Sequence, residues 1–412
     1  MIKHVVFMYP SRNLGGAQLL FARLARYLAE EDVLDVTVVD YHDGFIRRQL
    51  EGVVNVNFIN YYPGVTLPAD SVTITALTNL AYLRFMVSAK SLKGDFLLWS
   101  LHPKNIEHVI NSHFRRLFQL RRKKIFKELV ELAESGCIVF MDGCNKFSFE
   151  KVLGTKVIAE NYLPIPIPIP LPLERSLGSR IQTMGPEISI AWLGRISFDK
   201  VSAIKKIIED ISLSNYRHNV TFHVVGDGPE MGSVLKYINK KNVKLNHVGT
   251  LKQPALDQFL INQVDFGISM GTSSLEFAKL KIPVALVDYS LSKIPRSHGY
   301  IWLNDTVNFT LGNDVTWGFS RKMSFDDLVL ELSEDMINDV GSRCFDYVLN
   351  NHTLNSVSKK LLEALDIKAK ANRFKVTHVE SLISPYLFAL AFRTLRNIKC
   401  RLTSMLKTKN EG

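Results

Sequence analysis

The sequence predicts an α/β protein made of two doubly wound domains, each a parallel sheet flanked by helices. Short apolar runs alternate with helix-periodic segments through both halves of the chain, the pattern of repeated strand–helix–strand units. Prolines at every second position from 164 to 172 interrupt this pattern, and 412 residues exceed one ordinary core. We therefore predict a first domain over 1–163, an extended, semi-rigid linker over 164–173, a second domain over 174–366 and a basic tail over 367–412.

The first domain opens with a strand, a glycine turn and an amphipathic helix. Residues 5–9 are apolar, SRNLGG follows, and apolar residues recur at helical spacing over 17–28 before the next strand at 36–40. Gly15 and Gly16 stand at the helix entrance, where they can cradle an anion. The fingerprint GxGxxG is absent, so we predict no dinucleotide site, and a glycine turn required only by chain geometry is the alternative.

Further strands of this domain are predicted over 72–77, 96–101, 137–142 and 156–159. The second of them ends in LHP, which places His102 at the carboxyl end of a strand. Ligands bind at that edge of open α/β sheets, so His102 can donate to a ligand hydroxyl or polarise a leaving group. A structural histidine is the alternative.

The second domain restarts the alternation of strands and helices. Glycine turns, Gly194-Arg195 and GDGPE, follow its first two strands. The predicted strands are 188–193, 220–225, 244–248, 264–270 and 284–288, with helices over 201–211 and 254–262.

The stretch GTSSLEFAKLKIPV, which begins at Gly271, predicts a tight turn and a helix directly after a buried strand. Gly271 lets the backbone approach a ligand, and Thr272, Ser273 and Ser274 can cap the helix and offer hydroxyls. The first helical amides favour a phosphate, and Glu276, one turn on, can accept hydrogen bonds from a diol such as a ribose. Phosphate and diol together indicate a nucleotide. An ordinary capped helix with a solvated glutamate is the alternative.

The sharpest charge feature is the run 114–127, with seven Lys or Arg and no acidic residue. Apolar side chains interleave with the basic ones, so a helix here would present a basic surface with aromatic anchors, suited to anionic lipid headgroups. A solvated helix face and nucleic acid are the alternatives, and no nucleic-acid motif accompanies the run. We assign membrane contact to Arg115, Arg116, Arg121, Arg122, Lys123 and Lys124.

The tail at 384–409 is predicted to be a second membrane contact. Phe388 and Phe392 belong to an apolar set at helical spacing, and Arg393 and Arg396 belong to a basic side, as in an interfacial helix. The alternative is a C-terminal helix that packs back across the first domain, a role for which 354–365 is an equally good segment.

Composition sets the class of protein and its partners. With 51 Lys+Arg against 40 Asp+Glu, the net charge of +11 predicts an anionic partner: nucleic acid, an anionic membrane or a phosphorylated substrate. Four cysteines without CxxC or zinc-like spacing predict reduced thiols in the cytoplasm. No apolar run approaches the ~20 residues of a spanning helix, and the N-terminus turns polar too soon for a signal peptide. We expect a cytoplasmic protein, peripherally associated with the inner face of the cell membrane.

Four segments of the second domain, in order and spacing, resemble GT-B glycosyltransferases of the family-four-like, capsule and lipopolysaccharide type. They are WLGRISFDK, VVGDGPE, HVGT and DFGISMGTSSLEFAKLKIPV. The first domain resembles this family more weakly, through GGAQ, LHP and VIAENYLPIP, and the resemblance spans roughly residues 1–365. It implies a GT-B fold, in which two Rossmann-like domains face a central cleft, a natural ligand site.

The resemblance implies a donor site by position. Arg195 and Lys200 match the cations that hold the donor diphosphate. This leaving group gains negative charge in the reaction, and two fixed cations can stabilise that charge without the help of a metal ion. Glu276 matches the glutamate that binds the donor ribose, and residues 271–274 match the turn over the phosphates. No convincing DxD pair is present, so we predict no essential metal and no cofactor, with a UDP- or GDP-linked sugar as co-substrate.

The first-domain matches concern the acceptor. Gly15 and Gly16 match a glycine loop that closes on the donor or acceptor, and His102 matches a histidine near the transferred sugar. Two departures occur. The position of a second donor-side glutamate of the family is Ile268, which puts the sugar contacts and the stereochemistry in doubt, and the glycine that usually follows the lysine is Val201.

The sequence therefore predicts a glycosyltransferase that moves a sugar from a nucleotide-sugar donor to a lipid-linked or polysaccharide acceptor, with retention implied by the resemblance. Two alternatives are a nucleotide-sugar 2-epimerase-like GT-B enzyme, which needs acid/base carboxylates in the cleft, and a catalytically silent GT-B subunit that binds lipid or a partner enzyme. The replaced glutamate favours the second alternative.

Overall fold

The computed structural model describes residues 3–111, 115–169, 187–241, 243–319, 321–332 and 336–370, with the backbone alone at 111, 115–121 and 368–370. Contacts divide this part of the chain into two compact units. Unit 1 takes in the described residues up to Met141, Asn145–Leu163 and those from Ser358 on, and unit 2 takes in Asp142–Cys144 and the described residues of Pro164–Val357.

Unit 1 is built on a parallel sheet of six strands in the order β3-β2-β1-β4-β5-β6. The middle strand is apolar because both faces are covered, and Val5, Val6 and Phe7 are fully buried. The strands are β1 (His4–Met8), β2 (Asp35–Asp40), β3 (Val56–Asn60), β4 (Val72–Ala76), β5 (Asp95–Ser100) and β6 (Ile138–Phe140).

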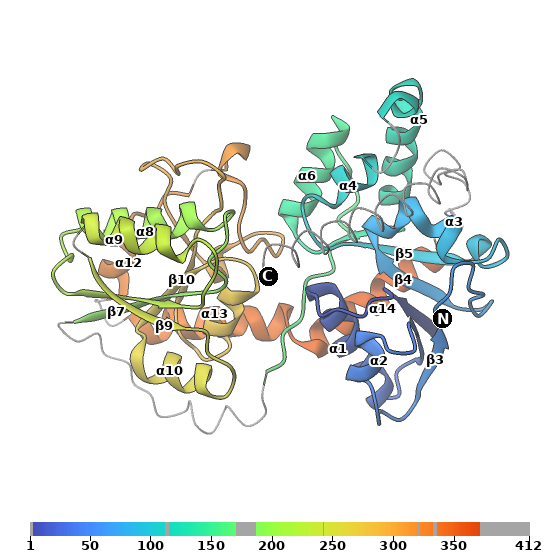
Figure 1. The fold of residues 1–412 in the computed structure, drawn as a ribbon, viewed down its shortest axis with the longest axis horizontal. Helices are drawn as coiled ribbons and strands as arrows, with labels where there is room; N and C mark the ends of the chain where they lie inside the picture. The colour runs from blue at the N-terminus through green and yellow to red at the C-terminus, as the bar shows by residue number, and fades with distance from the viewer. Residues whose placement is uncertain are drawn as a thin grey trace, which may run out of the picture. The chain divides into compact units, whose positions relative to one another are not determined.

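Helices cover both faces of the unit 1 sheet (Figure 1). The helices α1 (Gly16–Glu30) and α2 (Phe45–Gln49) pack together on one face. The others are α3 (Leu83–Met86), α4 (Asn105–Asn111), α5 (Arg115–Glu134), α6 (Gly143–Leu153) and α14 (Leu354–Lys370). The helix α14 leaves unit 2 and joins unit 1 at Ser358, so a helix over the segment 354–365 returns to the first half of the chain.

Unit 2 has a second sheet of six strands, in the order β12-β11-β10-β7-β8-β9, parallel except for β12. The strands are β7 (Ile188–Leu193), β8 (Val220–Val225), β9 (Lys244–Gly249), β10 (Phe266–Ser269), β11 (Val284–Leu286) and β12 (Ile301–Trp302). The helices are α8 (Val201–Leu213), α9 (Met231–Lys241), α10 (Ala255–Gln263), α11 (Thr272–Ala278), α12 (Phe325–Glu331) and α13 (Ile337–Asn351).

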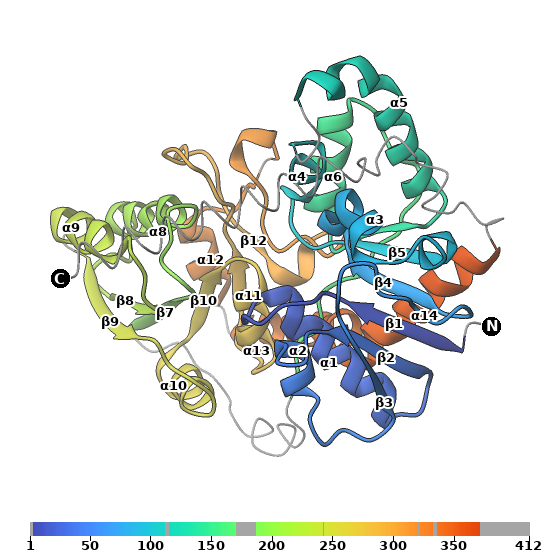
Figure 2. The ribbon, with the colours of Figure 1, turned by 45° about the vertical axis from the view of Figure 1, so that its right-hand side comes forward.

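The strand order of unit 2 reverses between β7 and β10. The chain passes from β7 to β8 and β9 on one side, then returns to form β10 on the other side of β7. Helices α8 and α9 lie side by side on one face of this sheet, with α10 on the opposite face (Figures 1 and 2). In open α/β sheets, the carboxyl ends of the two strands at such a reversal form the ligand site, so the ends of β7 and β10 are the place to examine.

Most predicted strands are confirmed, but the one over 156–159 is wrong. The amides of Ile158 and Ala159 donate to the carboxylate of Glu134, and the amide of Val157 donates to Glu150. These side chains take the donors that a neighbouring strand would need. The short edge strands β3 and β12 were not predicted.

The first half of the proline-alternating stretch packs on unit 2. The amide of Ile167 donates to His352 O at 2.8 Å, and the His352 ring lies 2.8 Å from Ile165 O. Ile167 is 2% exposed and belongs to the core of unit 2. The described part of the predicted linker, 164–169, therefore packs on unit 2, and 170–173 lie outside the described residues.

The basic run forms the helix α5, which extends to Glu134 and so gains acidic partners. Lys124 lies 3.8 Å from Glu128 and Lys127 lies 3.7 Å from Glu131, each four residues on. Ile125 is buried and Phe126 packs against the unit 1 core, so Phe126 does not serve as one of the predicted aromatic anchors.

Membrane contact by this helix and the tail stays a prediction. Arg122, Lys123 and Lys124 are exposed on α5, whereas the side chains of Arg115, Arg116 and Arg121 lie outside the described atoms. The tail residues Phe388, Phe392, Arg393 and Arg396 also lie outside the described residues. Within residues 3–370 as described, no helix is long and apolar enough to cross a membrane.

A buried histidine in β8 predicts an acid-sensitive unit 2. His223 is 5% exposed, its Nδ1 contacts Asn246 at 3.0 Å, and its Nε2 has no hydrogen-bond partner. Burial, together with the nearby Lys244, lowers the pKa of His223 below 6.5. Because the unfolded chain then binds more protons than the folded chain, stability is lost as pH falls below 6.5 towards the lowered pKa, by up to about 1.4 kcal/mol per pH unit.

We expect His223→Leu to reduce this acid loss, since leucine removes the titrating group and the unpartnered Nε2. The measurement is the free energy of unfolding in urea at about pH 7.5 and about pH 5.5. Equal pH dependence in wild type and variant would contradict the assignment.

Candidate functional site

Three turns meet at the carboxyl edge of the unit 2 sheet, beside the reversal of strand order. The turn after β7 is tied to the turn after β8, because Gly194 N donates to Val225 O and Ile196 N donates to Asp227 O, each at 3.0 Å. Between β7 and β10, Ser269 Oγ donates to Leu193 O at 3.0 Å. The edge is therefore held by hydrogen bonds on both sides of β7.

Lys200 and Ser273 converge on Gly194. A Cβ at Gly194 would lie 3.1 Å from Ser273 Oγ and 3.7 Å from Lys200 Nζ, and the Gly194 backbone has φ of +137°. The positive φ thus favours glycine, and a Cβ would crowd Ser273 Oγ. The Lys200 ammonium, at the start of α8, and the Ser273 hydroxyl, at the start of α11, therefore both lie close to the Gly194 backbone.

The electrostatics at this place favour an anion. Burial lowers the pKa of Lys200, Asp199 opposes the shift, and the guanidinium of Arg195 adds to it. Arg195 is exposed on the same turn. A group with negative charge would offset both the lost hydration of the ammonium and its repulsion by Arg195.

The start of α11 differs in one respect from the prediction. Its N-cap is Gly271, with φ of +62°, and no side chain caps the helix. Ser274 is fully buried and its Oγ donates to Gly271 O at 2.7 Å, so it stabilises the turn. Thr272 is exposed and Ser273 is half-buried, so both remain accessible from solvent.

Glu276 is held in place by two neighbours that the sequence analysis missed. Lys279 Nζ lies 2.6 Å from Glu276 Oε2, and Gln253 Nε2 donates to the same oxygen at 3.0 Å. Lys279 is 1% exposed and also lies 3.1 Å from Asp257. In the described part of the chain, Glu276 Oε1 has no hydrogen-bond partner, so a fixed carboxylate presents one oxygen to a ligand.

The glycine at 226 supports the same edge and gives a stability prediction. A Cβ there would overlap the carbonyl oxygen of Gly194, and φ is +133°. We expect Gly226→Ala to lower the free energy of unfolding by more than about 2 kcal/mol, since both strain and overlap oppose the side chain.

Gly232→Ala on α9 is the matched control for urea unfolding, because its Cβ would meet nothing within 4 Å. It should stabilise the protein by about 0.5 kcal/mol, as alanine favours a helix over glycine. Equal effects of the two substitutions would contradict the packing of Gly226 on Gly194.

The predicted residues of unit 1 lie at the carboxyl edge of its own sheet. Gly15 is the N-cap of α1 in extended conformation, with φ of −156°, and Gly16 has nothing within 4 Å of its Cβ position. The three atoms nearest to a Cβ at Gly15 all belong to the flexible end of the Gln18 side chain. Chain geometry therefore requires glycine at neither position, and open space for a ligand remains as an explanation.

His102 lies on the loop after β5, exposed and held by α4. Its amide donates to Asn105 Oδ1 at 3.0 Å, and its Nδ1 accepts from Lys104 N at 3.1 Å. Because β4 lies between β1 and β5, this loop is two strand spacings, about 10 Å, from the end of β1. The catalytic role of His102 stays a prediction.

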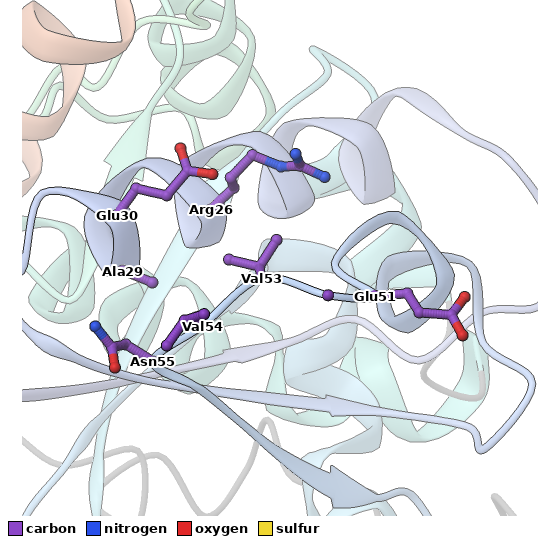
Figure 3. A pocket seen from close by; sticks show the side chains of 8 residues that line it. Arg26, Ala29, Glu30, Glu51, Val53, Val54 and Asn55 are labelled. Carbon is purple, nitrogen blue, oxygen red and sulfur yellow. The ribbon is translucent and has the colours of Figure 1, made fainter.

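A hollow of about 420 Å³ lies on unit 1 but contains none of these residues. Figure 3 shows Arg26 and Glu30 of α1 on one side and Val53 and Val54, from the loop between α2 and β3, on the other. This loop leads into β3, so the hollow lies at the amino edge of the sheet, opposite the edge where open α/β sheets bind ligands. Among the described residues, no group of three or more His, Cys, Asp or Glu is arranged to hold a metal.

Known structures share the architecture of both units. The lipopolysaccharide outer core galactosyltransferase WaaB in its apo form matches with a TM-score of 0.55 at 12% identity, over 89% of this chain and 99% of that one. A glycosyltransferase from Rickettsia africae ESF-5 matches with a TM-score of 0.53 at 12% identity, over 90% and 99%. The N-terminal domain of Candida albicans trehalose-6-phosphate phosphatase matches with a TM-score of 0.52 at 14% identity, over 89% and 97%.

No family model matches the chain, and no curated protein matches it by sequence. The structural matches show that the chain has the GT-B fold, as the resemblance predicted.

Proposed function

We propose that this protein is a glycosyltransferase that moves a sugar from a UDP- or GDP-linked donor to a lipid-linked or polysaccharide acceptor. The observation that carries the proposal is the convergence of Lys200 Nζ and Ser273 Oγ on Gly194, at the reversal of strand order in unit 2. The shared fold with WaaB, a lipopolysaccharide outer core galactosyltransferase, supports this class of reaction and acceptor.

In the proposed reaction, the bond between the anomeric carbon and the β-phosphate oxygen breaks, and an acceptor hydroxyl forms the new glycosidic bond as its proton passes to an oxygen of the departing diphosphate. The nucleoside diphosphate leaves with added negative charge. We assign the stabilisation of that charge to Lys200 and Arg195, with Ser273 and the Gly271 turn as further donors; the approach of Lys200 and Ser273 to Gly194 supports this assignment. Retention of configuration and independence from metal are part of the proposal.

The remaining roles follow from position. The free oxygen of Glu276 would accept the ribose hydroxyls, and its contacts with Lys279 and Gln253 fix its direction. On unit 1, we assign Gly15, Gly16 and His102 to the acceptor. The exposed basic residues of α5 and the basic tail would hold the protein on an anionic membrane surface, which suits a lipid-linked acceptor.

One observation favours a second candidate, a silent GT-B subunit. The position of the family's second donor-side glutamate is Ile268, which is fully buried in β10 and offers no polar group to a sugar. Such a subunit would keep the fold without binding a donor.

A thermal-shift screen against UDP, GDP, ADP, CMP and their sugars separates the two candidates. A ligand that binds the folded protein stabilises it by mass action and so raises Tm. At a ligand concentration of 100 times Kd, the gain in the free energy of unfolding is about 2.7 kcal/mol. If the protein is a glycosyltransferase, we expect the nucleotides of one nucleobase to raise the Tm of the wild type. The same nucleotides should not raise the Tm of Glu276→Ala or of Arg195→Ala. If no nucleotide shifts Tm, the donor site is refuted and the silent subunit takes its place.

A further inference from the structure

A basic pocket, separate from the proposed donor site, lies on the α8 face of unit 2. None of the proposed donor residues lines it. Its volume is about 280 Å³. The lining comes from α8, from α9 and from the loop after β11, and it includes Ser202, Lys205, Glu209, Ser292, Lys293 and Arg296. Lys205 lies five residues beyond Lys200 on α8, about 7.5 Å along the helix.

A buried carboxylate organises the cations at this pocket. Glu209 is 5% exposed and accepts hydrogen bonds from Tyr237 and from Arg296, the latter at 2.9 Å. Lys241 and Lys293 lie 3.4 and 3.7 Å from it. Hydrogen bonds from Tyr237 and Arg296 lower the pKa of Glu209 to about 2, so it stays ionised at neutral pH.

The cations outnumber the carboxylates here. Three cations share the one charge of Glu209, and Lys206 pairs with Asp210. Lys205 donates to Ser233 Oγ at 2.7 Å and has no carboxylate within ion-pair distance among the described residues. The pocket therefore carries excess positive charge beside hydroxyl donors.

We infer that this pocket binds a phosphomonoester, with Lys205 and Arg296 holding the phosphate and the hydroxyls of Ser202 and Ser292 beside it. A phosphate has three acceptor oxygens and up to two negative charges, which match this set of donors. The volume suits a small molecule of the size of a phosphorylated monosaccharide or less. The same chemistry could come from a free metabolite or from a phospholipid headgroup.

The test measures Tm and Kd of the full chain with inorganic phosphate and with glycerol 3-phosphate, beside vesicles of phosphatidylcholine with and without phosphatidic acid. Saturable binding is expected in wild type, and at least about tenfold weaker binding in Lys205→Gln and in Arg296→Gln, since each loses a charge-assisted hydrogen bond. Lys240→Gln on α9 is the matched control, because Lys240 is exposed and does not line the pocket. Lys200→Ala separates this pocket from the donor site and should bind phosphate normally.

Two outcomes overturn the inference. One is equal binding in Lys205→Gln, Arg296→Gln and Lys240→Gln, or no saturable binding of any probe. The other is loss of phosphate binding in Lys200→Ala with retention in Lys205→Gln, which would place the anion in the donor site. Binding of glycerol 3-phosphate would identify the ligand as a free metabolite. Binding that depends on Lys205 and occurs only with phosphatidic acid vesicles would identify it as a lipid headgroup. None of these outcomes depends on the nucleotide screen.

Discussion

Lys200→Ala is expected to lower kcat/KM for sugar transfer by about 10²–10³-fold, the cost of removing one fixed donor from a developing anion. The ammonium lies beside Gly194 and Ser273, where the leaving diphosphate is proposed to sit. Because the leaving group gains charge in the transition state, kcat should fall as well as kcat/KM. The measurement is initial rates with the donor that the nucleotide screen identifies.

The pH profile gives this prediction a second readout. Burial lowers the pKa of Lys200 below 10.5, and a lysine loses its charge as pH rises through its pKa. Activity measured as kcat/KM, which reports the free enzyme, should therefore decline on the alkaline side at a lower pH than for an ordinary lysine. Lys200→Arg keeps the charge, so this decline should disappear. The exposed Lys252→Ala is the control, and a similar rate loss in both alanine variants would contradict the assignment.

Lys279→Met is expected to lower the free energy of unfolding by about 3 kcal/mol, because it leaves two carboxylates without their shared cation. Lys279 is 1% exposed and lies 2.6 Å from Glu276 and 3.1 Å from Asp257. Methionine fills a similar volume, so the loss is one of charge compensation. Urea unfolding measures it, with the exposed Lys252→Met as the matched control. An equal loss of stability in Lys252→Met would contradict this account, because Lys252 is exposed.

The sequence predicted the strands of unit 2 well, for a physical reason. Strands buried on both faces are continuous apolar runs that end in glycine turns, and β7 and β8 match the predicted ranges 188–193 and 220–225. Two of the edge strands, β3 and β12, lack this signal. Residues 56–60 of β3 are half exposed, and β12 has two residues, so neither stands out from a loop.

Side-chain partners were predictable only where they share a helix. Lys279 follows Glu276 by three residues, a spacing that brings side chains together on a helix and could have indicated the pair. Gln253 is 23 residues away and reaches Glu276 through tertiary packing, for which the sequence has no local signal. The capping role predicted for Ser274 was wrong although its contact is local, since its hydroxyl donates to Gly271 O, three residues earlier.

The most direct test of the central claim compares a nucleoside diphosphate with the corresponding monophosphate. If Lys200 and Arg195 hold the β-phosphate, calorimetry of the wild type should give at least about tenfold tighter binding of the diphosphate, the worth of one charge-assisted contact. In Lys200→Ala, this advantage should shrink, because only Arg195 then holds the β-phosphate, while the monophosphate binds as before. An unchanged advantage in the variant, or equal weakening of both nucleotides, would contradict the placement of the diphosphate at Gly194.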